Sequence, residues 1–194
     1  MRSERPGKAP WRAPRVRVSL PTAVLLALAV IFKPLRDLLV PISAAMIHEL
    51  GHIIVIMLCG ADVGSIELSL FGAEIGALTG RLNKTRRIFV YAAGALANLV
   101  SGAVAAMFGS ELFCACSLAL AIVNLLPVRT LDGGCIAEEL LGSFRYGRTA
   151  LELLTGILVF ALWVAAVIAL LFSGNVSLWL LSVYLFVTLY LGGR

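Results

Sequence analysis

Two histidines four residues apart, His48 and His52, are the side chains of this sequence best suited to metal chemistry, and they are its only histidines. On an α-helix, residues with this spacing project from one face about one turn apart, so both imidazoles can reach one zinc ion. Glu49 follows the first histidine, where its carboxylate can take a proton from a zinc-bound water. The pattern predicts a hydrolytic zinc site. The structural alternative is an internal hydrogen-bonded pair of His48 and Glu49 in a helix bundle.

A catalytic zinc needs a third protein ligand and an open position, and the carboxylates are the candidates for the ligand. Most of them lie at segment ends or in loops, where solvation explains them. Asp132 differs because it follows an apolar run and precedes Gly133 and Gly134, which permit a tight turn and a close backbone approach. Asn124 interrupts that apolar run eight residues earlier, and Pro127 ends it. From the spacing alone, a metal ligand and an ordinary turn aspartate explain Asp132 equally well.

The composition places these residues in a membrane protein. Of the 194 residues, 60% are hydrophobic and 14% are charged, against about a quarter charged in soluble domains. The net charge of +5 comes from clustered basic residues, which favours positive cytoplasmic loops over nucleic-acid binding. The four cysteines form no disulfide-like framework, and we interpret them as small apolar helix residues.

The predicted fold is an all-α polytopic membrane protein with about six transmembrane helices and a short β-hairpin or re-entrant loop after the second. Residues 1–17 are expected to be a basic, disordered cytoplasmic tail, and residues 18–194 a single membrane-embedded domain. The strands of the hairpin are expected at Ser65–Leu70, where polar and apolar residues alternate, and at Glu74–Leu78. A short surface helix is expected at Ile136–Phe144. The six apolar segments are Val18–Phe32, Leu38–Cys59, Ile88–Phe108, Leu112–Leu126, Leu151–Phe172 and Val176–Leu191.

The basic residues also predict an orientation. With the N-terminus inside, only Lys33 and Arg36 lie in an outside loop, and the other Lys and Arg residues are cytoplasmic. Both termini and Asp132 would then be on the cytoplasmic side of the cell membrane. This alternation of basic inside loops with outside loops supports six spans, because removing one span would move some of the basic loops to the outside.

Three sequence elements together resemble the site-2 protease family of intramembrane zinc metalloproteases. They are His48–His52 (HELGH), Gly94–Asn98 (GALAN) and Asn124–Gly134 (NLLPVRTLDGG). Six spans without a PDZ or CBS domain look most like the branch of the stage IV sporulation protease, which processes a sigma-factor precursor. The resemblance covers Ala44 to Gly134. The family commonly has proline where Ala95 and Thr130 stand here, which leaves the shape of the loop before Asp132 open.

The resemblance implies one zinc ion per chain, held by His48, His52 and Asp132, with Glu49 as the general base. Asn124 would lie near the substrate or the oxyanion. For Asn98, substrate contact and an interhelical hydrogen bond are equally good explanations. The hairpin would pair with an unwound substrate by strand addition. The expected partners are a membrane-associated or transmembrane substrate and, as an open alternative, a regulatory membrane protein; the number of subunits is not predicted.

Three other functions compete with this prediction. A membrane metal transporter would use the same histidines and acids along a pathway, but it gives Glu49 no special role. A membrane-anchored zinc protease acting on unfolded cytosolic chains would usually carry its motif in a soluble portion. A catalytically dead scaffold is the least favoured, because every required ligand is present.

Overall fold

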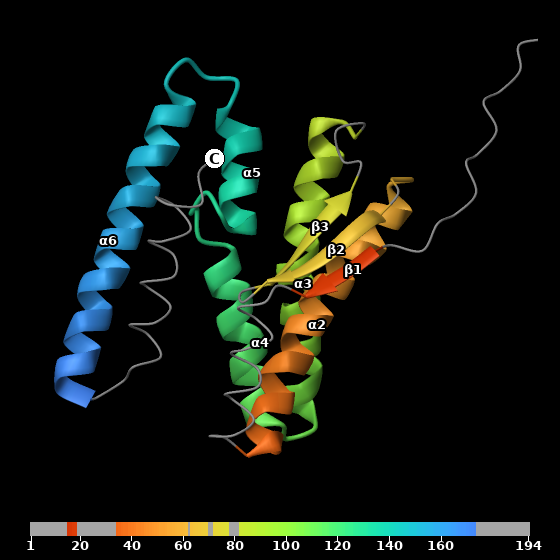
Figure 1. The fold of residues 1–194 in the computed structure, drawn as a ribbon, viewed down its shortest axis with the longest axis vertical. Helices are drawn as coiled ribbons and strands as arrows, with labels where there is room; N and C mark the ends of the chain where they lie inside the picture. The colour runs from red at the N-terminus through yellow and green to blue at the C-terminus, as the bar shows by residue number, and fades with distance from the viewer. Residues whose placement is uncertain (1–14, 19–33, 62, 70–71, 78–81, 174–194) are drawn as a thin grey trace, which may run out of the picture.

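The structure is a computed structural model that describes residues 15–18, 34–61, 63–69, 72–77 and 82–173. Two predicted segments fall outside this range: Val176–Leu191, and Val18–Phe32 apart from Val18 itself. In the described residues, helices dominate and a small sheet lies beside them (Figure 1).

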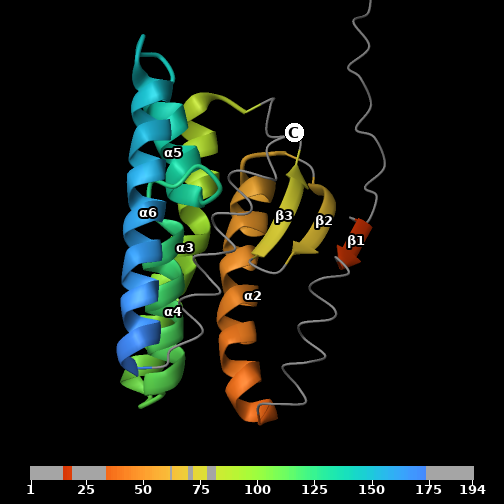
Figure 2. The same ribbon diagram turned by 60° about the vertical axis from the view of Figure 1, so that its left-hand side comes forward.

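The helices form two packed groups that meet at α3. Helix α2 (Leu35–Leu58) packs along α3 (Lys84–Met107), and α4 (Glu111–Asn124) contacts both. Helix α5 (Asp132–Leu141) packs against α3 and against α6 (Gly147–Ser173). Figures 1 and 2 show α5 above the end of α4, with α6 running beside them. Helix α3 therefore contacts both α2, which carries the histidines, and α5, which begins at Asp132.

Three of the described helices are long and apolar enough to cross a membrane. They are α2 over Leu38–Leu58, α3 over its whole length, and α6 over Gly147–Ile168. Helix α4 has 14 residues, which is about 21 Å at 1.5 Å per residue and short of the ~30 Å hydrocarbon core. The segment Leu112–Leu126, predicted as the fourth span, is thus a helix too short to cross alone, and it ends at Asn124, where the chain turns at Leu125. Among the described residues, three of the six predicted spans are present.

Small and polar residues fill the interior of the bundle, and large apolar residues cover its outside. The face that α3 buries consists of Val90, Ala93, Gly94, Ala95, Asn98 and Gly102. Phe108, Phe160 and Phe172 are instead well exposed. This distribution reverses that of a soluble domain. It suits helices in lipid, where small residues allow backbones to approach closely.

A three-stranded sheet lies beside α2. Strand β2 (Val63–Ser69) pairs antiparallel with β3 (Gly72–Ala77), in a register that places Glu67 opposite Glu74. These strands cover most of the two segments that the alternation predicted, and the bend between them falls at residues 70–71, outside the described range. Strand β3 is the edge strand of the sheet on the side away from β1.

Strand β1 (Arg15–Val18) corrects one expectation, because it contains the last three residues of the segment predicted to be a disordered tail. It pairs parallel with β2, placing Val16 opposite Ile66. The sequence Arg-Val-Arg-Val alternates with the period of a strand, and the edge of β2 supplies hydrogen-bonding partners for it. The analysis by overall polarity missed this short alternation.

Candidate metal centre

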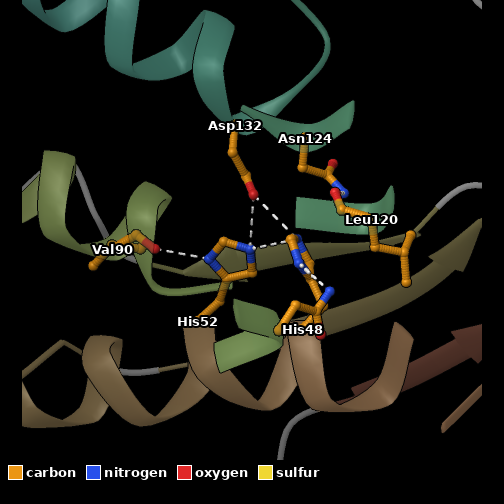
Figure 3. A network of polar contacts seen from close by, with 7 residues as sticks. His48, His52, Val90, Leu120, Asn124 and Asp132 are labelled. Atoms are coloured by element: carbon orange, nitrogen blue, oxygen red, sulfur yellow. Dashed lines mark hydrogen bonds and ion pairs between the residues drawn. The ribbon is translucent and has the colours of Figure 1, made fainter. Parts of the chain in front are cut away.

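His48 and His52 lie side by side on α2, at the point where α3 and α5 cover it. Both are almost completely buried, at 5% and 7% exposure. Their rings meet edge to face with centroids 4.8 Å apart, and their Nε2 atoms are 3.2 Å apart (Figure 3). One turn of helix therefore brings two ligand nitrogens to a single point.

Asp132 reaches the same point from α5. Its Oδ2 atom lies 3.1 Å from Nε2 of His48 and 3.1 Å from Nε2 of His52. Figure 3 shows the carboxylate pointing down onto the two rings. The structure thus brings together three side chains that are up to 84 residues apart in sequence.

The start of α5 differs from the sequence prediction. The sequence placed Asp132 in a loop and the short helix at Ile136–Phe144, whereas the helix begins at Asp132 itself and ends at Leu141. Gly133 and Gly134 are buried in its first turn. A Cβ atom on Gly133 would collide with the carbonyl of Leu125, and one on Gly134 with the carbonyl of Val128. The two glycines let the first turn of α5 lie directly against the chain that leaves α4, which fixes the position of Asp132.

The chain before Asp132 is ordered by a hydrogen bond in which the Leu131 amide donates to the Val128 carbonyl at 2.8 Å. Thr130, which stands where the family commonly has proline, is exposed in this turn. Ala95, at the other such position, is buried in α3. Neither residue prevents the approach of Asp132 to the histidines.

Glycines also allow α3 to lie close behind the histidines. A Cβ atom on Gly94 would lie only 2.6 Å from Nε2 of His48 and would collide with the His52 ring as well. On the facing helix, a Cβ atom on Gly51 would lie 2.6 Å from the carbonyl oxygen of Ala93. Because α3 comes this close, Nδ1 of His52 donates to the carbonyl oxygen of Val90 at 2.7 Å. That hydrogen bond leaves the Nε2 lone pair of His52 directed toward Asp132 and His48.

The arrangement of these three residues satisfies the requirements of a catalytic zinc site. One ligand atom from each of His48, His52 and Asp132 lies within 4.8 Å of the other two. Their closest separations, 3.1 to 3.2 Å, are near the ~3.3 Å expected between ligands that are each ~2.0–2.1 Å from a tetrahedral zinc ion. Two imidazoles and one carboxylate are also a usual donor set for catalytic zinc, with the fourth position left for water or substrate.

Asp132 carries the negative charge that such a site needs. Burial by itself raises the pKa of this carboxyl, but the hydrogen bonds and charge of His48 and His52 outweigh it and hold the pKa below its usual range. The carboxylate is thus the favoured form at neutral pH, with its oxygen available as a ligand.

Three further residues were predicted to belong to the site: Glu49, Asn98 and Asn124. Glu49 is half-buried, next to His48 on α2. Asn98 is fully buried, and its Nδ2 atom lies 3.3 Å from Nδ1 of His48. Asn124 is the last residue of α4, and its Nδ2 donates to the carbonyl of Leu120 at 3.0 Å (Figure 3).

An ion pair that the sequence analysis did not identify joins α3 to α5. Nε of Arg87 lies 2.6 Å from Oε1 of Glu139, and its Nη2 lies 2.8 Å from Oε2. The sequence interpretation placed Glu139 on a surface helix, and no local signal pairs it with a residue 52 positions away. The carbonyls of Val90, Leu125 and Val128 were missed for the same reason, since a backbone atom leaves no signature in the sequence.

The sequence model of one known protein family matches this chain. The model described as "Peptidase M50B-like" matches residues 21–131, more than half of the chain. The chain belongs to the peptidase M50B-like family. The matched range contains His48, Glu49, His52, Asn98 and Asn124, and it stops one residue before Asp132.

The fold of this M50B-like chain is similar to that of a solved protein, a site-2 protease from Methanocaldococcus jannaschii. The TM-score is 0.69 at 18% sequence identity, over 95% of this chain and 94% of the other. At this identity, the similarity shows a shared fold. A comparison with curated proteins gives no significant match.

As an M50B-like peptidase, the chain is a metallopeptidase, a hydrolase of peptide bonds. The apolar helices agree with a membrane protein. The group of His48, His52 and Asp132 is one that could hold a metal ion. Family, fold and site agree with the resemblance to site-2 proteases, and they do not favour the metal-transporter alternative.

Proposed function

We propose that this M50B-like peptidase is a zinc metalloendopeptidase that cleaves a transmembrane or membrane-associated protein within or near the bilayer. The observation that supports it most is the convergence of Nε2 of His48, Nε2 of His52 and Oδ2 of Asp132 within 3.2 Å of one another. This group is built between helices whose outer surfaces are apolar. A hydrolytic site in that environment suits a substrate that lies in the membrane.

His48, His52 and Asp132 would hold the zinc ion. When bound, zinc supplies Lewis-acid activation of a water molecule and of the scissile carbonyl. Asp132 adds a negative charge beside the two imidazoles, and the burial of His48 and His52 limits access of bulk water. The hydrogen bond from Nδ1 of His52 to Val90 fixes the direction of that ring.

Glu49 is proposed as the general base and later the general acid. Its position directly after His48 on α2 and its half-buried side chain support this role. It would accept a proton from the attacking water and deliver that proton to the leaving amine nitrogen. A positioned acid–base group of this kind typically accounts for ~10²–10⁴-fold in rate.

Substrate binding is proposed to use the sheet and the end of α4. A transmembrane substrate must unwind before cleavage, because helical carbonyls are engaged in hydrogen bonds. Strand β3 contacts α2, so the sheet lies next to the helix that carries both histidines (Figure 2). An unwound segment could add to a strand of this sheet, with the Asn124 amide near the scissile carbonyl or the oxyanion.

The six-span topology and the cytoplasmic location of both termini belong to this proposal, supported by the distribution of Lys and Arg. In this topology the 14-residue helix α4 would cross where the bilayer is locally thin, as short spans do. Assignment to the sporulation branch rests on the resemblance alone. A sigma-factor precursor encoded beside this gene would support that assignment, and labelling of a cysteine introduced at Lys84 from the outside would contradict the topology.

The function can be tested with purified protein in liposomes. The probe is a panel of single-span fluorescent peptides that carry Gly or Pro in their membrane segment. We expect cleavage of at least one peptide, loss of cleavage after a zinc chelator, and recovery after zinc is restored. Zinc entry into the liposomes with every peptide left intact would instead show a transporter and contradict the proposal.

A further inference from the structure

The side chain of Asn98 directs its amino group, and not its oxygen, at His48, one of the proposed metal ligands. Its side chain is fully buried on α3, and its amide nitrogen Nδ2 faces Nδ1 of His48 at 3.3 Å. Its oxygen Oδ1 has no hydrogen-bond partner. Among the described residues, only Ser117 Oγ shares this condition of being a buried side-chain atom without a partner. A buried carbonyl oxygen with no donor is unfavourable, so the orientation of this amide needs an explanation.

The explanation lies in the two neutral tautomers of His48. With the proton on Nε2, the ring donates to Oδ2 of Asp132 at 3.1 Å, and Nδ1 can accept from Nδ2 of Asn98. With the proton on Nδ1, the Nε2 lone pair is free for a metal ion, and Nδ1–H requires an acceptor. Facing that proton with the Nδ2 amino group would set two donors against each other.

Turning the Asn98 amide over by about 180° removes the conflict. The two orientations occupy nearly the same volume, so the exchange needs no repacking of the helices. Oδ1 would then accept from Nδ1–H of His48, which also supplies the partner that this oxygen lacks. His52 has the equivalent arrangement already, because its Nδ1 faces the Val90 carbonyl at 2.7 Å.

We propose that Asn98 is a positioning residue that selects the metal-binding tautomer of His48, with Oδ1 accepting from Nδ1–H in the metal-loaded protein. The proposal rests on the metal site proposed above. It assigns each histidine one acceptor from α3: a backbone carbonyl for His52 and a side-chain amide for His48. Asparagine can serve both tautomers because it presents either a donor or an acceptor.

Three variants separate this role from simple packing. Asn98→Leu removes both hydrogen-bonding groups at similar volume. Asn98→Asp keeps an acceptor toward Nδ1–H. Ser117→Ala is the matched control, because it deletes the other buried polar atom without a partner, on α4. We expect zinc affinity, measured by chelator competition in detergent, to fall ~10–100-fold in Asn98→Leu. Zinc affinity should stay within a few-fold of wild type in Asn98→Asp and should be unchanged in Ser117→Ala.

A second readout does not depend on any variant folding. The chain has two histidines, so ¹⁵N labelling of histidine gives ring signals from only two side chains. In the zinc-loaded wild-type protein, both rings should carry a proton on Nδ1 in a hydrogen bond. Binding of zinc through Nδ1 of His48 would overturn the proposal, as would equal zinc affinity in Asn98→Leu and wild type. A wild-type protein that bound no zinc would contradict the proposed function itself. That result differs from normal zinc binding with no effect of Asn98→Leu, which would contradict only the role of Asn98.

Discussion

Arg87, near the start of α3, binds Glu139 on α5 through two parallel contacts of 2.6 and 2.8 Å. Arg87 also donates to the Leu82 carbonyl at 2.9 Å, which fixes the guanidinium at the end of its helix. Because α5 begins with Asp132 and the Val90 carbonyl holds His52, this pair joins the two helices that position the ligands. A two-point Arg–carboxylate contact restricts orientation more than a single contact does.

Replacing Glu139, in the last turn of α5, with Gln should therefore weaken the contact between α5 and α3. We expect zinc affinity to fall by less than ~10-fold, since Glu139 acts on the ligands only through the helix. The control is Glu138→Gln, because Glu138 makes a single 3.4 Å contact with the exposed Arg148. Equal effects of the two substitutions, measured by chelator competition, would show that the Arg87 pair has no special role.

The same pair should make stability depend on pH. The hydrogen bond from Arg87 holds the pKa of Glu139 below its usual range. A carboxyl whose folded pKa is depressed contributes stability above its unfolded pKa of ~4.3, and that contribution is lost as pH falls through the folded value. Wild type should thus be more stable than Glu139→Gln near neutral pH, and the melting temperatures in detergent should converge below about pH 4. A difference that persisted at low pH would contradict this.

Gly94→Ala should displace the histidines. The added Cβ would lie 2.6 Å from Nε2 of His48, the proposed ligand atom. We expect zinc to be lost or its affinity to fall by ~10-fold or more, while the helices persist by circular dichroism. Gly156→Ala on α6 is the control, because no heavy atom lies within 4 Å of its Cβ position. That substitution should be neutral or stabilise the helix by up to ~1 kcal/mol. Normal zinc affinity in Gly94→Ala would show that α3 lies farther from the rings.

Local sequence determined part of this site and long-range packing the rest. Helix periodicity alone places His48 and His52 on one face, so two of the three residues of the group could be predicted from the sequence. Asp132 is 80 residues beyond His52; its local sequence left a ligand and a turn aspartate equally good, and the family resemblance favoured the ligand. Spacing could not show that Gly133 and Gly134 sit inside a helix, because their role depends on carbonyls of the chain leaving α4.

The fold, like the site, could be predicted from the sequence only in part. The apolar runs located α2, α3 and α6 to within a few residues, since each is long enough to be read from hydropathy. The run at Leu112–Leu126 also predicted a helix, and its 15 residues were already short of the ~20 that a span needs; α4 has 14. Strand β1 depends on the edge of β2, a partner about 50 residues away.

If Glu49 performs acid–base chemistry at a zinc ion held by His48, His52 and Asp132, Glu49→Gln should separate zinc binding from catalysis. The substitution keeps the size of the side chain and leaves all three ligands intact. We measure zinc per chain and peptide cleavage on the same preparation in liposomes, with Asp132→Asn as the comparison that removes a ligand charge. The prediction for Glu49→Gln is about one zinc per chain, as in wild type, with cleavage reduced ~10²–10⁴-fold; Asp132→Asn should bind zinc more weakly and also lose activity. Cleavage by Glu49→Gln at near the wild-type rate would contradict the account.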